Sequence, residues 1–595
     1  MKLSSLKYSI PCIFSLCFSL FFFTGCSHPS QNNTSSGDKF DNFLTSCFRE
    51  YVSSDTVTTH FKLAHPEAFG LSDQKNPCYE DFSPDQQKKN CQHAETFLTQ
   101  LKSFDANELS EEDQFTRKVF RDFLEKQIAS EEYILYASPL GTNGLQSQIP
   151  VTLSEYSFEE EKDVQAYLSL VNQIPDFFSQ IIRFEEARQQ AGLVSPAFVF
   201  HNTIDQINQW LNCSEKENLL IETFDDKIQK VPDLSNDQKN SYIHNNRALI
   251  KQVVLPAFTQ LKEQLKTLSS SDGLDRTSRD GICQYEKGKE YYQFLLSAGV
   301  GTQLSSEQCI QILENQLKET VSHLGSLTKE NPDLYTEYLS AQPTLTDTRT
   351  ILRSLREDTF IDFPEPPEVS FTLKEVPDAL SSTSASAFYL LPPIDTTEEN
   401  VIYINPKRVD SSEQFSTLAH EGYPGHLYQN NYYLSTDPEP IRSLTRCNGY
   451  DEGWGTYAQL YSYQYMDFQD TDAQTTQLLR KLYRDNDILS LTLSSLSDLY
   501  VNTRSYHLED LEQFLASYGV PAENAQNIYT YVVENPANYL SYSIGWYELE
   551  QLRQTMEKKL GEGFDIHEFH QAVLDAGSCS FPLLSRQVRK SMTSQ

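Results

Sequence analysis

Residues 415–430 read Phe-Ser-Thr-Leu-Ala-His-Glu-Gly-Tyr-Pro-Gly-His-Leu-Tyr-Gln-Asn, which is the most informative stretch of the chain. In a zincin helix two histidines are four residues apart, about 6 Å along the axis and about 40° around it, so both rings reach one zinc ion. Here His420 and His426 are six residues apart, which on a regular helix means about 9 Å and about 240°. A shared metal therefore requires a break in the helix, and Pro424 and Gly425 are residue types that permit one.

A third ligand is expected from the segment that follows. Residues 450–457 read Tyr-Asp-Glu-Gly-Trp-Gly-Thr-Tyr, and Glu452 stands 26 residues after His426. Two imidazoles and one carboxylate are a typical catalytic zinc set with an open fourth position for water, and Glu421 beside His420 fits the general base. A His-Glu-x4-His pattern also arises by chance in long chains, so the residues alone leave a metal site and a chance pattern both open.

These motifs resemble a known family. The stretch from His420 to His426 with Gln429, followed by Glu452-Gly453-Trp454 and Tyr457, resembles the signature of the bacterial domain of unknown function 885 family, itself similar to gluzincin metallopeptidases. Residues 288–292, 403–405 and 541–545 agree with it, so the similarity spans most of the chain. The resemblance implies a bound Zn²⁺ held by His420, His426 and Glu452, with Glu421 as the catalytic base.

Three further site residues are expected. The resemblance places Tyr542 where related peptidases have a donor to the tetrahedral oxyanion, a role that competes with an ordinary structural one. Arg446 is interpreted as a ligand of a substrate carboxylate or as a partner of Asp451, and Tyr403 as a substrate-binding residue at a strand end. The chain departs from the family where a histidine is usual, because His507 comes one position late after 502–506.

The predicted fold is mainly α, with a small β-sheet beside the zinc-binding helix and a central cleft. Helical spacing predicts an N-terminal helical region over 40–365, and short β-branched and aromatic runs around 368–373, 387–391 and 401–405 predict the sheet at the start of a metal-bearing region over 366–595. The strand just upstream of the zinc helix is expected to hold an extended substrate by β-addition. Three apolar stripes should face the core: Val164, Tyr167, Leu168, Val171, Ile174, Phe178, Ile181 and Ile182; Leu249, Val253, Ala257, Leu261 and Leu265; and, after a Ser305–Gln308 capping box, Ile310, Leu313, Leu317, Val321 and Leu324.

Composition limits the class of partner. The chain has 595 residues with a formal net charge of -35, which argues against nucleic-acid phosphates and against electrostatic attachment to anionic membranes. With 38% hydrophobic and 12% aromatic residues it should form packed cores. The eight cysteines after residue 26 are compatible with disulfides or with free buried thiols.

The N-terminus has the order of a bacterial lipoprotein signal. Lys2 and Lys7 precede an apolar run over 8–23, and Phe23-Thr24-Gly25 leads to Cys26. We expect a signal peptide over 1–25, lipidation of Cys26, a flexible tether over 26–39, and membrane attachment through the lipid only.

The sequence therefore predicts an extracytoplasmic, lipid-anchored zinc metallopeptidase that hydrolyses peptides, with His420, His426 and Glu452 as ligands. Two alternatives stay open: a surface lipoprotein that binds peptides or proteins without catalysis, and a metal-dependent hydrolase of esters or non-peptide amides.

Overall fold

The computed structural model describes residues 35–71, 76–269, 275–365, 367–377, 385–396, 398, 400–408 and 413–593. The predicted signal peptide and Cys26 lie outside these residues. The first helix begins at Ser36, within the segment predicted as a tether. Among the described residues, no helix combines the length and apolarity needed to cross a membrane.

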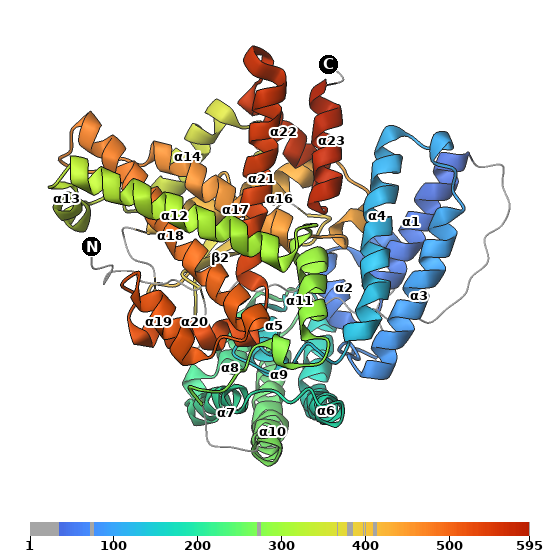
Figure 1. Ribbon diagram of the computed structural model, residues 1–595. Coiled ribbons are helices and arrows are strands. Elements are labelled where there is room, and N and C mark those ends of the chain that lie inside the picture. The colour runs from blue at the N-terminus through green and yellow to red at the C-terminus, as the bar shows by residue number, and fades with distance from the viewer. Residues whose placement is uncertain are drawn as a thin grey trace.

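The fold is mainly α-helical, as predicted, and Figure 1 shows the N-terminal helices α1, α3 and α4 together at one side of the molecule. The helices before the sheet are α1 (Ser36–Val52), α2 (Thr56–Lys62), α3 (Pro84–Lys102), α4 (Glu111–Ala129), α5 (Leu145–Glu155), α6 (Glu161–Gln190), α7 (Ala197–Asn212), α8 (Leu219–Lys230), α9 (Asn236–Leu249), α10 (Leu255–Leu268), α11 (Gly288–Leu295), α12 (Ser306–Glu330), α13 (Leu334–Ser340) and α14 (Thr348–Asp362). Those after it are α15 (Gln414–Glu421), α16 (His426–Ser435), α17 (Asn448–Ser462), α18 (Ala473–Arg504), α19 (Leu508–Ala516), α20 (Ala522–Glu534), α21 (Asn538–Leu560), α22 (Ile566–Ala576) and α23 (Phe581–Thr593).

The three predicted stripes form helices, with two corrections to their buried faces. All the predicted positions of α6 are buried, and the Ser305–Gln308 capping box is present at the start of α12. A π-helical turn over Ile250–Val254 joins α9 to α10, and its extra residue makes Val254 the buried position in place of Val253. On α12 Val321 is 41% exposed, because Thr320 continues the buried spacing of Leu313 and Leu317.

The sheet has three strands, β1 (Phe371–Glu375), β2 (Ala387–Leu390) and β3 (Asn400–Ile404), in the order β1-β3-β2. β3 pairs in parallel with β1 and antiparallel with β2. The strand just upstream of the zinc helix is therefore central and has both of its edges paired, which corrects the prediction that it holds substrate by β-addition. β2 is the edge strand that adjoins α15.

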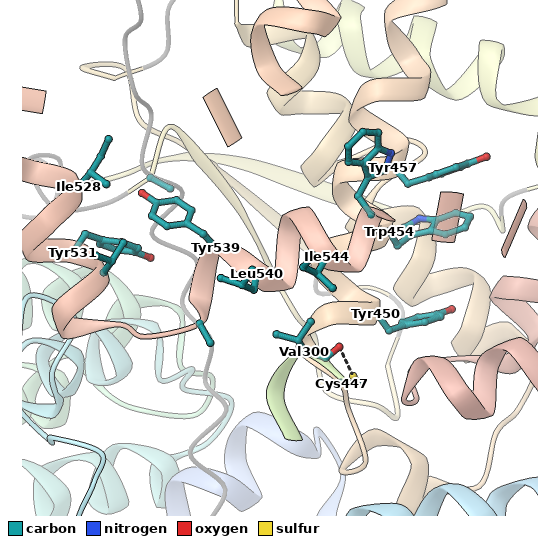
Figure 2. Close-up of a cluster of buried hydrophobic side chains, with 14 of the residues drawn as sticks. Val300, Cys447, Tyr450, Trp454, Tyr457, Ile528, Tyr531, Tyr539, Leu540 and Ile544 are labelled. Carbon is teal, nitrogen blue, oxygen red and sulfur yellow. Dashed lines mark hydrogen bonds between the residues drawn. The ribbon is translucent and has the colours of Figure 1, made fainter. Parts of the chain in front are cut away.

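One large hydrophobic cluster extends from Phe82 to Met592 and so includes both predicted regions. A second cluster fills the bundle of α1, α3 and α4 and includes Ile441 and Leu444 from the segment before α17. Figure 2 shows part of the large cluster, with Tyr450 and Trp454 of α17 and Leu540 and Ile544 of α21 among its labelled side chains. α17 and α21 cross in close contact, because a Cβ added to Gly453 would meet the Gly545 backbone at 2.4 Å.

All eight cysteines of the described residues are free thiols, which favours the second of the two predicted alternatives: Cys47, Cys78, Cys91, Cys213, Cys283, Cys309, Cys447 and Cys579.

Candidate metal centre

The histidine motif is divided between two helices. α15 ends at Glu421 and α16 begins at His426, with the four residues 422–425 forming a non-helical connection. Gly425 permits this path, since a Cβ there would lie 1.8 Å from the His420 carbonyl oxygen. The indole Nε1 of Trp454 donates to the Pro424 carbonyl at 2.9 Å, which ties the break to α17. The predicted interruption of the helix is thus confirmed.

The break brings the three predicted ligands together. Nε2 of His420 and Nε2 of His426 each lie 3.5 Å from Oε2 of Glu452, and the two ring centroids are 4.7 Å apart. One ligand atom from each residue falls within 4.8 Å of the others. His420, His426 and Glu452 come from three different helices, so the cluster exists only in the folded chain.

The chemistry of the cluster fits a metal ion. Among the described residues, neither Nε2 of His420 nor Oε2 of Glu452 has a hydrogen-bond partner, although both atoms are buried. Burial alone would raise the pKa of Glu452, but the two imidazoles outweigh it and lower that pKa to about 2. Burial opposes the charged form of His426, yet the Glu452 carboxylate raises its pKa to about 9. Buried polar atoms left unpaired are costly, and a cation between them would satisfy both.

A chain of hydrogen bonds fixes the His420 ring. Nδ1 of His420 lies 3.1 Å from Oε1 of Gln459, whose Nε2 donates to Oδ2 of Asp487 at 2.8 Å. The Tyr463 hydroxyl donates to the same Asp487 oxygen at 2.5 Å. A carboxylate only accepts, so Asp487 turns the amide nitrogen of Gln459 toward itself and the amide oxygen toward His420. Nδ1 then carries the proton, and Nε2 keeps a lone pair for a metal.

Room for the ring comes from the helix that carries Glu452. A Cβ added to Gly455 would meet Nε2 of His420 at 2.6 Å and its Cε1 at 2.7 Å. Four consecutive residues of α17 therefore have distinct roles. Glu452 is a candidate ligand, and Gly453 allows the close crossing with α21. Trp454 bonds to the helix break at Pro424, and Gly455 leaves space for the His420 ring. Gln459 lies seven residues after Glu452 on the same helix face, a spacing from which the sequence could have indicated it.

Glu421 is buried beside the cluster and is positioned by the edge strand. The backbone N–H of Tyr389 on β2 donates to Oε2 of Glu421 at 2.9 Å. Glu421 is only 4% exposed, and burial raises the pKa of its carboxyl. The sequence does not indicate that Tyr389 contacts Glu421, because this contact is made by the backbone N–H of a paired strand.

Tyr542 also lies at the cluster. Its ring stacks at 6.0 Å from the His420 ring, and the side chain is buried. Burial, reinforced by the nearby Glu452 carboxylate, raises the pKa of Tyr542 well above its ordinary value. The hydroxyl is therefore protonated at neutral pH and is available as a donor.

Two cavities meet at the cluster. The front cavity, of about 330 Å³, is lined on one side by N-terminal residues such as Phe61 and Phe177, and on the other by Glu421, His426 and Glu452. The rear cavity, of about 150 Å³, is lined by His420, Glu421 and Tyr542 together with small polar side chains of α18. Glu421 lines both, so the candidate ligands separate two spaces, and the N-terminal helices form one wall of the predicted central cleft.

The other predicted site residues lie in two different places. Arg446 lines the front cavity, and its Nε donates to Asp451 at 3.1 Å. Tyr403 is not brought to the site, because it is buried on the central strand, stacks on Phe388 at 4.7 Å and donates to Glu155 at 2.6 Å. His507 is the N-cap of α19 and accepts from the Asp510 backbone N–H, so it is a capping residue.

By fold and site, this is a mainly α-helical protein with a candidate metal centre of two histidines and a glutamate, at a cleft that N-terminal helices line on one side. Within that class the chain belongs to the family described as "Bacterial protein of unknown function (DUF885)", which it matches over residues 66–588. No curated protein matches the chain in sequence.

Two solved structures share the fold. A "putative lipoprotein" from Colwellia psychrerythraea is 18% identical, covers 94% of this chain and 100% of its own, and superposes with a TM-score of 0.79. A "putative lipoprotein of unknown function" from Shewanella oneidensis is 14% identical, covers 93% of this chain and 99% of its own, with a TM-score of 0.63. Likeness at these identities concerns the fold.

Proposed function

We propose that the protein is a zinc-dependent hydrolase of peptides. The observation that carries the proposal is the convergence of His420, His426 and Glu452 on one point, with a buried carboxylate, Glu421, beside them at the junction of two cavities. The resemblance of the motif to gluzincin metallopeptidases supports the same reaction class.

Each side chain has a part in the proposed chemistry. Zinc in such a site supplies Lewis acidity that polarises a carbonyl and acidifies water. Glu421 takes the proton of the attacking water and passes it to the leaving amine, and the Tyr389 N–H holds its carboxylate in place. The Tyr542 hydroxyl donates to the oxyanion, a type of contact typically worth about 10²–10³ in rate. Gln459 and Asp487 orient His420.

A peptide suits the shape of the site. The front cavity is lined by His426 and Glu452, the rear cavity by His420, and both by Glu421, so a chain that occupies both has a bond at the metal centre. β2 runs from Ala387 in the rear cavity to Leu390 in the front cavity, and its edge faces Glu421. We favour a peptide over a compact ester as the substrate, because an extended peptide can lie alongside β2.

The decisive experiment separates metal binding from chemistry. Glu421→Gln keeps the shape of the side chain but removes the base, so it should retain about one zinc per chain while peptide hydrolysis falls by roughly 10²–10⁴. His420→Ala and Glu452→Ala should lose the zinc, as measured by elemental analysis.

A library of short peptides with free and blocked termini provides the substrate test. Equal turnover by the wild type and Glu421→Gln would refute the mechanism. No turnover of any peptide by the zinc-loaded wild type would favour the binding protein, and turnover of esters alone would favour the third alternative.

We further propose that Cys26 carries a lipid that anchors the protein at the outer side of the cytoplasmic membrane. The order of charged, apolar and small residues before Cys26 supports this location. Cys26→Ser should release the protein from membranes, because a chain of net charge -35 has no electrostatic anchor to replace the lipid. Unchanged membrane association, measured by fractionation and immunoblotting, would show that the anchor lies elsewhere.

A further inference from the structure

A third cavity, of about 380 Å³, lies between α17, α18 and α21. We call it the cation cavity, because Arg480, Lys481, Arg484 and Arg553 line it, and Glu550 is the one carboxylate in its lining. The other walls include the aromatic side chains of Tyr461 and Trp546 and the amides of Gln464 and Gln477. This composition is unusual in a chain with 83 acidic and 48 basic residues.

Two of the four cations form no ion pair within the described part of the chain. Arg480 pairs with Asp467 at 2.7 Å, and Arg553 pairs with Glu550 and Glu557. Within the described part of the chain, Lys481 and Arg484 make neither an ion pair nor a hydrogen bond. Like charges three and four residues apart on one helix repel each other. Asp485 offsets part of the charge of Lys481 and Arg484 on α18, and an anion bound in the cation cavity would neutralise more of it.

The cation cavity lies next to the rear cavity along the same helices. The same three helices line both, and Leu460 belongs to both linings. Along α21, Tyr542 lines the rear cavity, whereas Glu550 and Arg553 line the cation cavity. Eight to eleven residues of helix correspond to about 12–16 Å. An extended peptide rises about 3.3 Å per residue, so four or five residues cover this distance.

We propose that the cation cavity binds the carboxylates of an acidic peptide segment, four or five residues from the part of the peptide that lies over the metal centre. Guanidinium groups bind carboxylates in a bidentate manner, and the Tyr461 and Trp546 rings supply apolar walls for the side-chain stems. The binding step is independent of catalysis. That the bound peptide is also a substrate rests on the proposed function.

The test measures binding by calorimetry on the full chain carrying Glu421→Gln, so that no peptide is consumed. The probe is an octapeptide of five alanines followed by three glutamates, and the matched peptide has three glutamines. Lys481→Gln combined with Arg484→Gln should weaken binding of the glutamate peptide by about tenfold or more. Lys88→Gln combined with Lys89→Gln, two exposed lysines of α3, changes the net charge equally and should leave the affinity unchanged.

The outcomes are distinct. Equal affinity for the two peptides, or an equal loss in the Lys88 and Lys89 control, would overturn the proposal. If amidation of the peptide C-terminus alone abolishes binding, the cavity recognises a terminal carboxylate, and the assignment to acidic side chains is wrong. Selective binding of the glutamate peptide without its hydrolysis by the zinc-loaded wild type would support the cation cavity and count against the proposed function.

Discussion

Gly455→Ala is the sharpest test of the metal centre, because it should lower zinc affinity strongly while changing the stability of the zinc-free chain little. Gly455 lies inside α17, where alanine is preferred over glycine by about 0.5–1 kcal/mol. The added Cβ, however, would lie 2.6 Å from Nε2 of His420, whereas ordinary contacts begin at 3.4 Å. The ring must therefore withdraw by about 0.8 Å or rotate.

A zinc–nitrogen bond is only about 2.0–2.1 Å long, so a shift of this size removes His420 from the ligand set. We expect zinc affinity to fall about 100-fold or more, equivalent to about 2.8 kcal/mol. The free energy of unfolding of the zinc-free chain should stay within about 1 kcal/mol of the wild type, because helix propensity offsets part of the strain. Competition with a chelator of known affinity measures the first quantity, and urea denaturation the second.

Gly325→Ala is the matched control. Gly325 is an exposed glycine inside α12, and no heavy atom lies within 4 Å of the position of its added Cβ. This variant should be more stable by about 0.5–1 kcal/mol and bind zinc like the wild type. A folded Gly455→Ala variant with zinc affinity within threefold of the wild type would refute the assignment of His420 Nε2 as a ligand.

Two other predictions concern the surroundings of the site. Asp487→Asn lets the Gln459 amide turn over and present its nitrogen to His420, so zinc affinity should fall about 10–100-fold; an unchanged affinity in the folded variant would exclude the orienting role. His570 is buried between the Asp362 carbonyl and the Tyr457 hydroxyl, and burial lowers its pKa from 6.5 to about 3, so the unfolded chain takes up the proton first as pH falls. Stability from His570 is thus complete above pH 6.5 and falls by about 2 kcal/mol by pH 5, a loss that His570→Gln should lack when unfolding is measured at both pH values.

Most of the fold was predictable because its signals are local. Apolar spacing identifies α6 and α12, and the pair of Ser305 and Gln308 marks where α12 begins. The need for one metal to reach His420 and His426 predicted the break after α15. The position of the π-helical turn had no such signal, so the predicted face of α10 was wrong before residue 257.

The site was predictable as far as its motifs extend. The three ligands and Glu421 lie within 33 residues, but Asp487 and Tyr389 reach the centre from α18 and β2. Tyr403 was misassigned because strand order cannot be read from the strands alone, and a central strand buries what an edge strand would expose. The cation cavity is lined by residues between 457 and 553 on three helices, and the sequence does not indicate how these helices pack together.

The single large hydrophobic cluster determines how the protein responds to cleavage of its chain. It includes Phe82 before α3 and Met592 on α23, so its members come from both sides of the predicted boundary between 365 and 366. Neither half buries its apolar surface alone, so a protease cut at that boundary yields two pieces that remain associated. The first half also leaves the ribosome hundreds of residues before the elements that cover it. Its apolar faces therefore stay uncovered until the second half has been made, which exposes the partly synthesised chain to aggregation.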